Sequence, residues 1–548
     1  MPVIQVSLSR LSQYCRQKVD SKKILETLPY LGLDIEDQVG DSVTVEYSPN
    51  RPDYSSEAGI ARSLVGLLGI DTGLPKYEFE SSNFSIKVVG KEIAQTRPHI
   101  AGIYAEVYIS DEVIKQLIEV QEDLHNGIGR KRSKVAIGIH NAAVVKPPIQ
   151  YYGETNSNYS FIPLGGNVPM QIKKILEETE QGVKYRGLLT NVYPLLVDSQ
   201  ENVLSMPPII NGELTRLKSG ISSVFVDITG TEERTVDTCA AIIAAMLSDM
   251  KAKVKTVTVE DGSRRSLSPN MSPRQMKFDL ALVNDILGFQ FSIEEATRAL
   301  EKSRLEVASD GAAQIPKFRH DIIHPIDLVE EVALGYGIAK MEAVGTKSSL
   351  VGAFNPELRQ RDRLVEVLVG LGLTEVWNLS LTSFENAILG GDSSLLKVDD
   401  PKSQSFEYLR SELMTSLLGT LGASTHLEYP QRIFEQAIVF KPDASSVSGV
   451  REDEHVAVAI ADSNANYSLI HSILDAFLRL AVGSSKSISL IPSHQGQGIF
   501  SPERCAQVTD GITQVGHIGE VSPEILEKFN IRVPVVGFEI NIGTLLKE

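Results

Sequence analysis

The sequence has little cysteine, little aromatic character and no long apolar run, and each shortage excludes a class of protein. Its 3 cysteines (Cys15, Cys239 and Cys505) are too few and too scattered for a disulfide framework or a zinc site. The longest apolar helical stretch, near residues 240–247, is too short to span a bilayer, and the start of the chain lacks an apolar core of signal-peptide length. These features predict a reduced, cytoplasmic protein with no membrane association.

An excess of positive charge is also missing. The net charge of −17 argues against a protein that coats nucleic acid non-specifically, but it leaves room for docking one nucleic acid through a local patch. The best candidate patch is the run Arg130, Lys131, Arg132 and Lys134. A solvated basic loop is the alternative interpretation of such a run.

Patterning along the 548 residues predicts a multidomain α+β protein. Residues 1–83 mix strands with helices, and include a strand near residues 3–8 and a helix capped by Ser55 or Ser56. Residues 84–262 carry many β-like runs punctuated by two helices, and the polar, proline-bearing residues 263–275 are typical of a linker. A compact unit at 276–344 and a larger α+β domain at 345–548 follow.

Four carboxylates gather in the phrase KFRHDIIHPIDLVEEVALGYG, residues 317–337. Pro325 suits the first turn of a helix, on which Asp327, Glu330 and Glu331 share one arc, and Asp321 lies just upstream. Such a set suits a hard divalent cation, which prefers oxygen ligands. The alternative is a solvated acidic face near a helix N-terminus.

This phrase, with NRPDY at residues 50–54, resembles the phenylalanine–tRNA ligase β subunits of the archaeal and eukaryotic type. The resemblance implies that Asp321, Asp327, Glu330 and Glu331 bind Mg²⁺. It implies an assembly of two α and two β chains that attaches phenylalanine to its tRNA at the expense of ATP. It also implies an editing domain at 84–262 and a class II synthetase-like core, built on an antiparallel sheet, at 345–548.

The last domain resembles a class II core that has lost its chemistry. Such cores clamp the ATP phosphate with bidentate arginines, whereas Lys441 and Asp443 stand where an Arg and a Glu are expected. Gly496, Gly498, Glu503 and Arg504 only faintly resemble the glycine-rich element, and the residues after them predict a hairpin. We therefore expect ATP and phenylalanine activation to reside in the α subunit.

The editing domain is expected to hydrolyse tyrosine wrongly attached to the phenylalanine tRNA. The resemblance assigns the phenol-recognising position to Glu213, with Asn211, Ser205, Asp227 and Asp237 as further pocket residues. His140 is a weaker candidate, because Asn141 follows it where the family has Asp. Turn or capping roles remain open for each residue, and no catalytic triad is visible in the sequence, so an oriented water is the expected nucleophile.

Two other functions stay open. The chain could be a purely structural assembly subunit with an inactive editing domain, or a free-standing hydrolase that uses a metal on the acidic helix.

Overall fold

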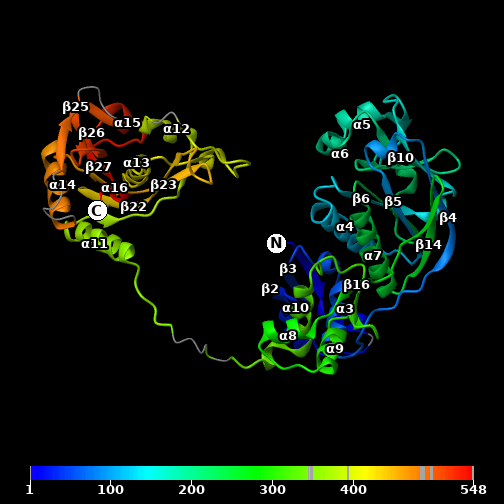
Figure 1. The fold of residues 1–548 in the computed structure, drawn as a ribbon. Coiled ribbons are helices and arrows are strands. Elements are labelled where there is room, and N and C mark those ends of the chain that lie inside the picture. Colours follow the sequence, from blue (N-terminus) through cyan, green and yellow to red (C-terminus); the bar gives the residue numbers. More distant parts are fainter. Residues whose placement is uncertain are drawn as a thin grey trace. The chain divides into compact units, whose positions relative to one another are not determined.

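The computed structural model describes residues 2–15, 17–343, 345, 350–391, 394–481, 488–493 and 498–545. The chain divides into two compact units, Met1–Gly345 and Thr346–Glu548, and helices and strands are mixed in both (Figure 1). The predicted multidomain α+β class is confirmed. Within the described ranges, no helix combines the length and the apolar character needed to cross a membrane.

The first unit begins with a small sheet of three antiparallel strands in the order β1-β3-β2. The strands are β1 (Val3–Ser7), β2 (Leu33–Val39) and β3 (Ser42–Tyr47), and the helices are α1 (Leu8–Tyr14), α2 (Ser21–Thr27) and α3 (Glu57–Leu67). The predicted capped helix is confirmed, because the Ser56 side chain accepts a hydrogen bond from Gly59 N at the start of α3.

A ten-stranded sheet follows, in the order β12-β11-β10-β7-β4-β14-β5-β13-β6, with β15 paired to β14. Its strands are β4 (Glu80–Val89), β5 (His99–Glu106), β6 (Val135–Asn141), β7 (Ile149–Glu154), β10 (Tyr193–Val197), β11 (Val203–Met206), β12 (Ile210–Asn211), β13 (Ser223–Gly230), β14 (Lys253–Asp261) and β15 (Arg264–Ser268). A short pair, β8 (Ser160–Phe161) with β9 (Met170–Gln171), and helices α5 (Ile172–Glu178) and α6 (Glu180–Tyr185) lie between β7 and β10 in the sequence.

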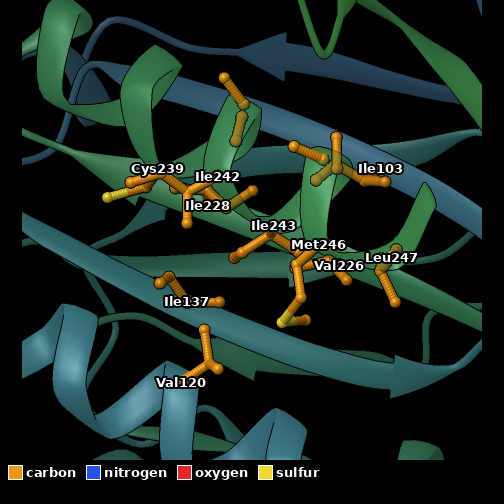
Figure 2. Packing of buried hydrophobic residues seen from close by; sticks show 14 of the residues in the cluster. Ile103, Val120, Ile137, Val226, Ile228, Cys239, Ile242, Ile243, Met246 and Leu247 are labelled. Carbon is orange, nitrogen blue, oxygen red and sulfur yellow. The ribbon is translucent and has the colours of Figure 1, made fainter. Parts of the chain in front are cut away.

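Two long helices, α4 (Asp111–Asn126) and α7 (Glu233–Asp249), supply apolar side chains to the main core of this domain. Figure 2 shows Ile242, Ile243 and Met246 of α7 packed with Val226 and Ile228 of β13. Burial of both faces fixes β13 between β5 and β6, and this central strand carries Asp227.

The stretch expected to be a linker, residues 263–275, is not irregular throughout. Residues 264–268 form β15, which pairs with β14 in the register Val257↔Ser268. Most β15 side chains are exposed, so the strand is held by backbone pairing and leaves no apolar alternation in the sequence. The polar composition of residues 263–275 therefore gave no indication of this strand.

The next part of the first unit is a three-stranded sheet with three helices. The strands, in the order β16-β18-β17, are β16 (Arg274–Lys277), β17 (Glu306–Val307) and β18 (Ala312–Ile315). The helices are α8 (Leu280–Leu287), α9 (Ile293–Lys302) and α10 (Pro325–Tyr336). Pro325 occupies the first turn of α10, as the sequence predicts.

The second unit is built on a seven-stranded sheet, in the order β19-β22-β23-β27-β26-β25-β24, in which every neighbouring pair except β19 with β22 is antiparallel. The strands are β19 (Thr374–Glu375), β22 (Gln431–Pro442), β23 (Val450–Ala461), β24 (Ser489–Pro492), β25 (Phe500–Thr509), β26 (Gln514–Val521) and β27 (Val535–Asn541). The predicted hairpin after the glycine-rich stretch is β25 with β26. A second short pair is β20 (Leu381–Thr382) with β21 (Tyr408–Leu409).

Alternation along β23 assigns the two faces of this sheet. Val456, Val458 and Ile460 share a core with side chains of α11 (Pro356–Gly370) and α14 (Tyr467–Ala481). Ala457 and Ala459 share another with α13 (Met414–Ala423). Short helices α12 (Phe384–Ala387), α15 (Pro523–Lys528) and α16 (Ile542–Leu545) complete the unit.

Candidate functional site

A cavity of about 420 Å³ lies in the domain of the ten-stranded sheet. Three of the five predicted editing residues, Ser205, Asn211 and Asp227, line it. Its other polar lining residues are Gln121, Glu122, His125, Arg132, Gln181, Thr215 and Arg216. A cavity of this size accommodates a drug-sized or amino-acid-sized ligand.

The buried carboxylate of Asp227 is the centre of a hydrogen-bond network at this cavity. Asp227 Oδ2 lies 2.7 Å from His140 Nε2 and 3.3 Å from Ser205 Oγ, and both Asp227 and His140 are almost fully buried. His140 Nδ1 lies 2.8 Å from Thr215 Oγ1. A carboxylate oxygen accepts hydrogen bonds, so the tautomer with its proton on Nε2 fits this contact.

Strand pairing explains how the network is positioned. Asp227 on β13 lies opposite Gly138 on β6, two residues before His140. A Cβ at Gly138 would lie 2.2 Å from Asp227 Oδ2 and 2.7 Å from His140 Nε2. Only glycine therefore allows the imidazole and the carboxylate to meet at this point of the sheet.

His140 belongs to the site more directly than the sequence indicates. The substitution that weakened it as a candidate, Asn141, lies at the end of β6 and caps the following turn by accepting a hydrogen bond from Ala143 N at 3.1 Å. Asparagine performs this capping role as well as aspartate does. The change at residue 141 thus leaves His140 in contact with Asp227.

Glu213 lies beside the cavity and is not among its lining residues. It follows Asn211 and Gly212, and its carboxylate accepts a hydrogen bond from Gly165 N at 2.7 Å and pairs with Arg216 at 3.3 Å. The hydrogen bond from Gly165, followed by the interactions with Arg216, lowers the pKa of Glu213. Its partner Arg216 does line the cavity, and so does Leu164, which precedes Gly165.

Asp237 is not brought to the cavity. It lies on α7, and its Oδ2 atom pairs at 2.7 Å with Nζ of Lys317, which precedes the acidic helix α10. The Lys317 side chain is 17% exposed. The structure thus gives Asp237 an ion-pair role between two parts of the first unit, which corrects its placement in the pocket.

Helix α4 contributes a charged group that the sequence analysis missed. Glu122 Oε1 lies 3.2 Å from His125 Nδ1 and 2.9 Å from Arg132 Nη2, and all three residues line the cavity. The His125 hydrogen bond, together with Arg132, lowers the pKa of Glu122 to about 2. The signal in the sequence was the i, i+3 spacing of Glu122 and His125, which places the two side chains on one side of the helix.

The basic run does not form one patch. Arg132 bonds to Glu122 and to Ile209 O, and Lys134 pairs with Glu232 at 2.8 Å, whereas Arg130 and Lys131 are exposed. Arg132 is thus held within the protein, Lys134 lies in an exposed ion pair, and Arg130 and Lys131 are the exposed candidates for phosphate contact.

The four carboxylates of the acidic motif do gather around the start of α10, but with protein partners. Arg319 binds Asp321 through Nε at 2.9 Å and Nη2 at 2.6 Å, and it also pairs with the buried Glu331. Asp327 Oδ2 accepts hydrogen bonds from Ile323 N and His324 N, both at 2.7 Å, and so caps the helix.

Glu330 is the exposed member of the set. Its partial burial, followed by the negative charges of Glu331, Asp321 and Asp327, raises its pKa, so the four groups are close enough to repel one another. All are oxygen donors of the kind that hard cations prefer. In this conformation, no group of three or more potential ligands within the described ranges is arranged as a ready metal site, because Arg319 already neutralises two of the carboxylates.

The residues of the expected ATP motifs are dispersed in the second unit. Lys441 lines a cavity on the α13 side of the sheet, whereas Asp443 lies in the turn after β22, where it bonds to Ser445. Arg504 pairs with Glu520 at 2.7 Å and does not line that cavity. Gly496 lies outside the described residues.

Comparison with known protein families identifies two domains of the chain. A family model described as the tRNA synthetase B5 domain matches residues 276–338, which contain the acidic motif. A second, described as the phenylalanyl tRNA synthetase beta chain CLM domain, matches residues 343–542. Together with the α+β fold, these matches define the chain as a subunit of an aminoacyl-tRNA synthetase.

Relatives of full length make the family specific. The phenylalanine–tRNA ligase beta subunit of Archaeoglobus fulgidus is 36% identical over 558 residues, covering 99% of this chain and 98% of its own. That of Korarchaeum cryptofilum is 34% identical and covers 100% of both chains. A crystal structure of an N-terminal fragment of the phenylalanyl-tRNA synthetase beta subunit from Pyrococcus horikoshii aligns with a TM-score of 0.58 at 32% identity, over 61% of this chain and 100% of that one. The chain belongs to the family of phenylalanine–tRNA ligase β subunits, in its archaeal type.

Proposed function

We propose that the chain works with an α subunit, two copies of each, to attach phenylalanine to its tRNA, and that its own cavity hydrolyses tyrosyl-tRNA made in error. The relatives that match over nearly their whole length are named as phenylalanine–tRNA ligase beta subunits, which supports the first part. The observation that carries the second part is the buried Asp227–His140 pair beside a cavity of about 420 Å³.

The need for such a site follows from binding energies. An apolar pocket that accepts phenylalanine rejects an analogue with one added hydroxyl only by roughly a hundredfold, so a second, hydrolytic site is the usual remedy. The hydrolytic site must in turn reject phenylalanine. It can do so only by hydrogen bonding to the phenol.

In this proposal Asp227 and Ser205 orient the water that attacks the ester carbonyl. Both residues line the cavity, and Asp227 Oδ2 already accepts hydrogen bonds from Ser205 and His140. His140 is a positioning residue. Its Nε2 atom contacts Asp227, and its Nδ1 atom contacts the Thr215 hydroxyl. Asn211 shapes the turn at the cavity edge.

Glu213 is the proposed acceptor for the tyrosine phenol. Its carboxylate keeps acceptor capacity beyond the bonds from Gly165 and Arg216, because two carboxylate oxygens offer about four lone-pair sites. Its partner Arg216 lines the cavity, as does Leu164, the residue before its other partner Gly165. Glu122 is the other carboxylate to compare with Glu213. It lines the cavity, but its carboxylate already bonds to His125 and Arg132.

The acidic motif is the proposed Mg²⁺ site, held by Asp321, Asp327, Glu330 and Glu331. The ion would supply positive charge that relieves the repulsion acting on Glu330. Mg²⁺ keeps several waters and needs only one or two direct carboxylate ligands, which is compatible with Arg319 retaining its contacts to Asp321 and Glu331. We assign it a structural role in the first unit.

Charging assays test the subunit assignment. The chain is purified with a co-expressed α subunit, and phenylalanylation is measured for each chain alone and for both together. The proposal expects a stable complex, and activity only when both chains are present. Phenylalanine charging by this chain alone, above a blank, would contradict it.

Deacylation separates the proposal from the two alternatives. A purely structural subunit would leave tyrosyl-tRNA intact, whereas a free metal-dependent hydrolase would lose its turnover when EDTA removes the metal. The proposal expects tyrosine release that persists in EDTA, because Asp227 and Ser205 lie far along the chain from the acidic motif and bond to each other.

A further inference from the structure

The second unit contains a larger cavity, of about 810 Å³, on the face of its sheet that also packs against α13. Side chains from β22, β23, β26 and β27 form one wall, and Gly390, Gly391 and Gly498 contribute another part of the lining. Its charged and titratable residues carry both signs: Glu412, Asp453 and Glu539, and Lys441, Arg451, His455 and His517.

Most of these charges are already satisfied within the protein. Glu539 accepts hydrogen bonds from Leu413 N and Met414 N, both at 2.9 Å, and its other oxygen lies 2.6 Å from His455 Nδ1. Asp453 pairs with Arg451 at 3.0 Å. These groups build the wall of the cavity and have little capacity left for a ligand.

Glu412 is only partly satisfied, by hydrogen bonds with Thr415 that act to lower its pKa. Its Oε1 atom is shielded from solvent and has no hydrogen-bond partner among the described residues. Burial, followed by the charge of Glu539, raises the pKa of Glu412 to about 8. A buried acceptor without a partner loses the free energy of a hydrogen bond, which a ligand cation can restore.

Lys441 provides the opposite charge at the same cavity. It is half-buried at the end of β22, and its charge acts on both Glu412 and His517. Lysine is a compact point charge that suits one carboxylate, but it lacks the planar fork that clamps a phosphate during adenylate formation. The lining also includes the apolar residues Met414, Ile499, Phe500 and Val515, among polar residues such as Ser411 and Gln514.

We propose that this cavity binds a free α-amino acid with an apolar side chain, with its ammonium group on Glu412 and its carboxylate on Lys441. A buried carboxyl group that can ionise beside a bound ammonium, a lysine, and apolar residues in the lining match the three parts of such a molecule. The proposal is for binding without activation: among the described residues, the lining arginine Arg451 bonds to Asp453 through Nε, and Arg504 does not line the cavity. This ligand site is distinct from the editing cavity of the first unit.

The test uses the full-length chain without an α subunit, in calorimetric titrations with three probes that share one apolar group. L-leucine carries both charges, 3-methylbutylamine carries only the ammonium, and 4-methylpentanoate carries only the carboxylate. The proposal expects leucine to bind at least about tenfold more tightly than either single-charge probe, since each charge-assisted hydrogen bond contributes to affinity.

Two variants locate the binding site. Glu412→Gln and Lys441→Gln are each expected to weaken leucine binding by about tenfold or more. Asp443→Asn is the matched control, because it removes a carboxylate two residues from Lys441, in a turn that does not line the cavity, and should leave affinity unchanged. Glu412→Gln is isosteric with the neutral carboxyl, and a thermal unfolding scan of each variant verifies the fold.

Three outcomes would overturn the proposal. Leucine binding could be absent from the wild-type chain, or equal to that of 3-methylbutylamine, which would make the site a simple cation site. It could also persist unchanged in both folded cavity variants, which would place leucine elsewhere, such as in the first unit.

Discussion

Arg51 Nε lies 3.9 Å from Asp321 Oδ1, so the two phrases that carry the family resemblance meet in the structure. Arg51 belongs to NRPDY, where it also binds Asp53 at 2.8 Å and stacks on the Tyr54 ring. Asp321 belongs to the acidic motif and is held by Arg319. A network of alternating charges therefore joins the N-terminal segment to the domain that contains α10.

Replacing Asp321 by Asn should destabilise the first unit by about 3–5 kcal/mol, since it leaves Arg319 and Arg51 buried with less compensation. Burial raises the pKa of Asp321, but Arg319 and Arg51 outweigh it and hold the pKa well below its usual range. This stabilisation is present above the unfolded pKa and is lost as the pH falls. Denaturant unfolding at neutral pH measures the loss, and Asp310→Asn, at an exposed turn, is the control. Equal stability of both variants would mean that the network contributes nothing.

Glu330→Gln should have opposite effects with and without Mg²⁺. Without the ion, removing one of four repelling carboxylates should stabilise the chain slightly, by up to about 0.5 kcal/mol. With the ion, the variant should lose the concentration-dependent rise in melting temperature that Mg²⁺ gives the wild-type chain. Thermal scans in EDTA and in a Mg²⁺ series measure both effects. A wild-type chain that does not respond to Mg²⁺ would leave the motif as an ion-pair network.

Glu412→Gln should remove a pH dependence from the second unit. Because burial and Glu539 raise the pKa of Glu412 to about 8, the native state holds a proton that the unfolded state releases. Stability therefore falls as the pH rises between about pH 5 and pH 8. Calorimetric scans across this range should show a smaller decline for the variant, and the variant should be the more stable chain at the upper end. Parallel curves for the two chains would contradict the assignment.

Glu213→Ala should slow the release of tyrosine from its tRNA by roughly ten- to a hundredfold, equivalent to about 1–3 kcal/mol, while phenylalanine charging by the α/β complex stays nearly intact. The comparison variant is Glu122→Ala, which removes the other carboxylate near the cavity. If only the Glu122 variant loses the preference for tyrosine, the phenol acceptor lies on α4.

The sequence predicted those features of the fold that depend on residues close together in the chain. The cap at Ser56, the Pro325 start of α10 and the β25–β26 hairpin are short-range patterns, and all three are confirmed. Strand β15 was hidden because exposed polar residues pair through their backbone alone.

The candidate site was harder to predict, because it is made by residues far apart in the chain. His140 meets Asp227 across a strand pair, 87 residues away, and the contact depends on the missing side chain of Gly138. The resemblance placed Asp237 in the pocket, yet α7 carries it to Lys317. Arg319, the partner of two predicted metal ligands, stands within the motif itself, but only the fold shows that it turns toward them.

The rate of tyrosine release from tyrosyl-tRNA, measured for the assembled α/β complex with Asp227→Asn in this chain, tests the central claim most directly. Asp237→Asn is the matched control, since it removes a carboxylate of the same domain that lies outside the cavity. The account predicts a loss of at least about tenfold for the Asp227 variant, unchanged release for the Asp237 variant, and phenylalanine charging near the wild-type rate in both. Tyrosine release at the wild-type rate by a folded Asp227 variant would contradict the claim that this cavity is the editing site.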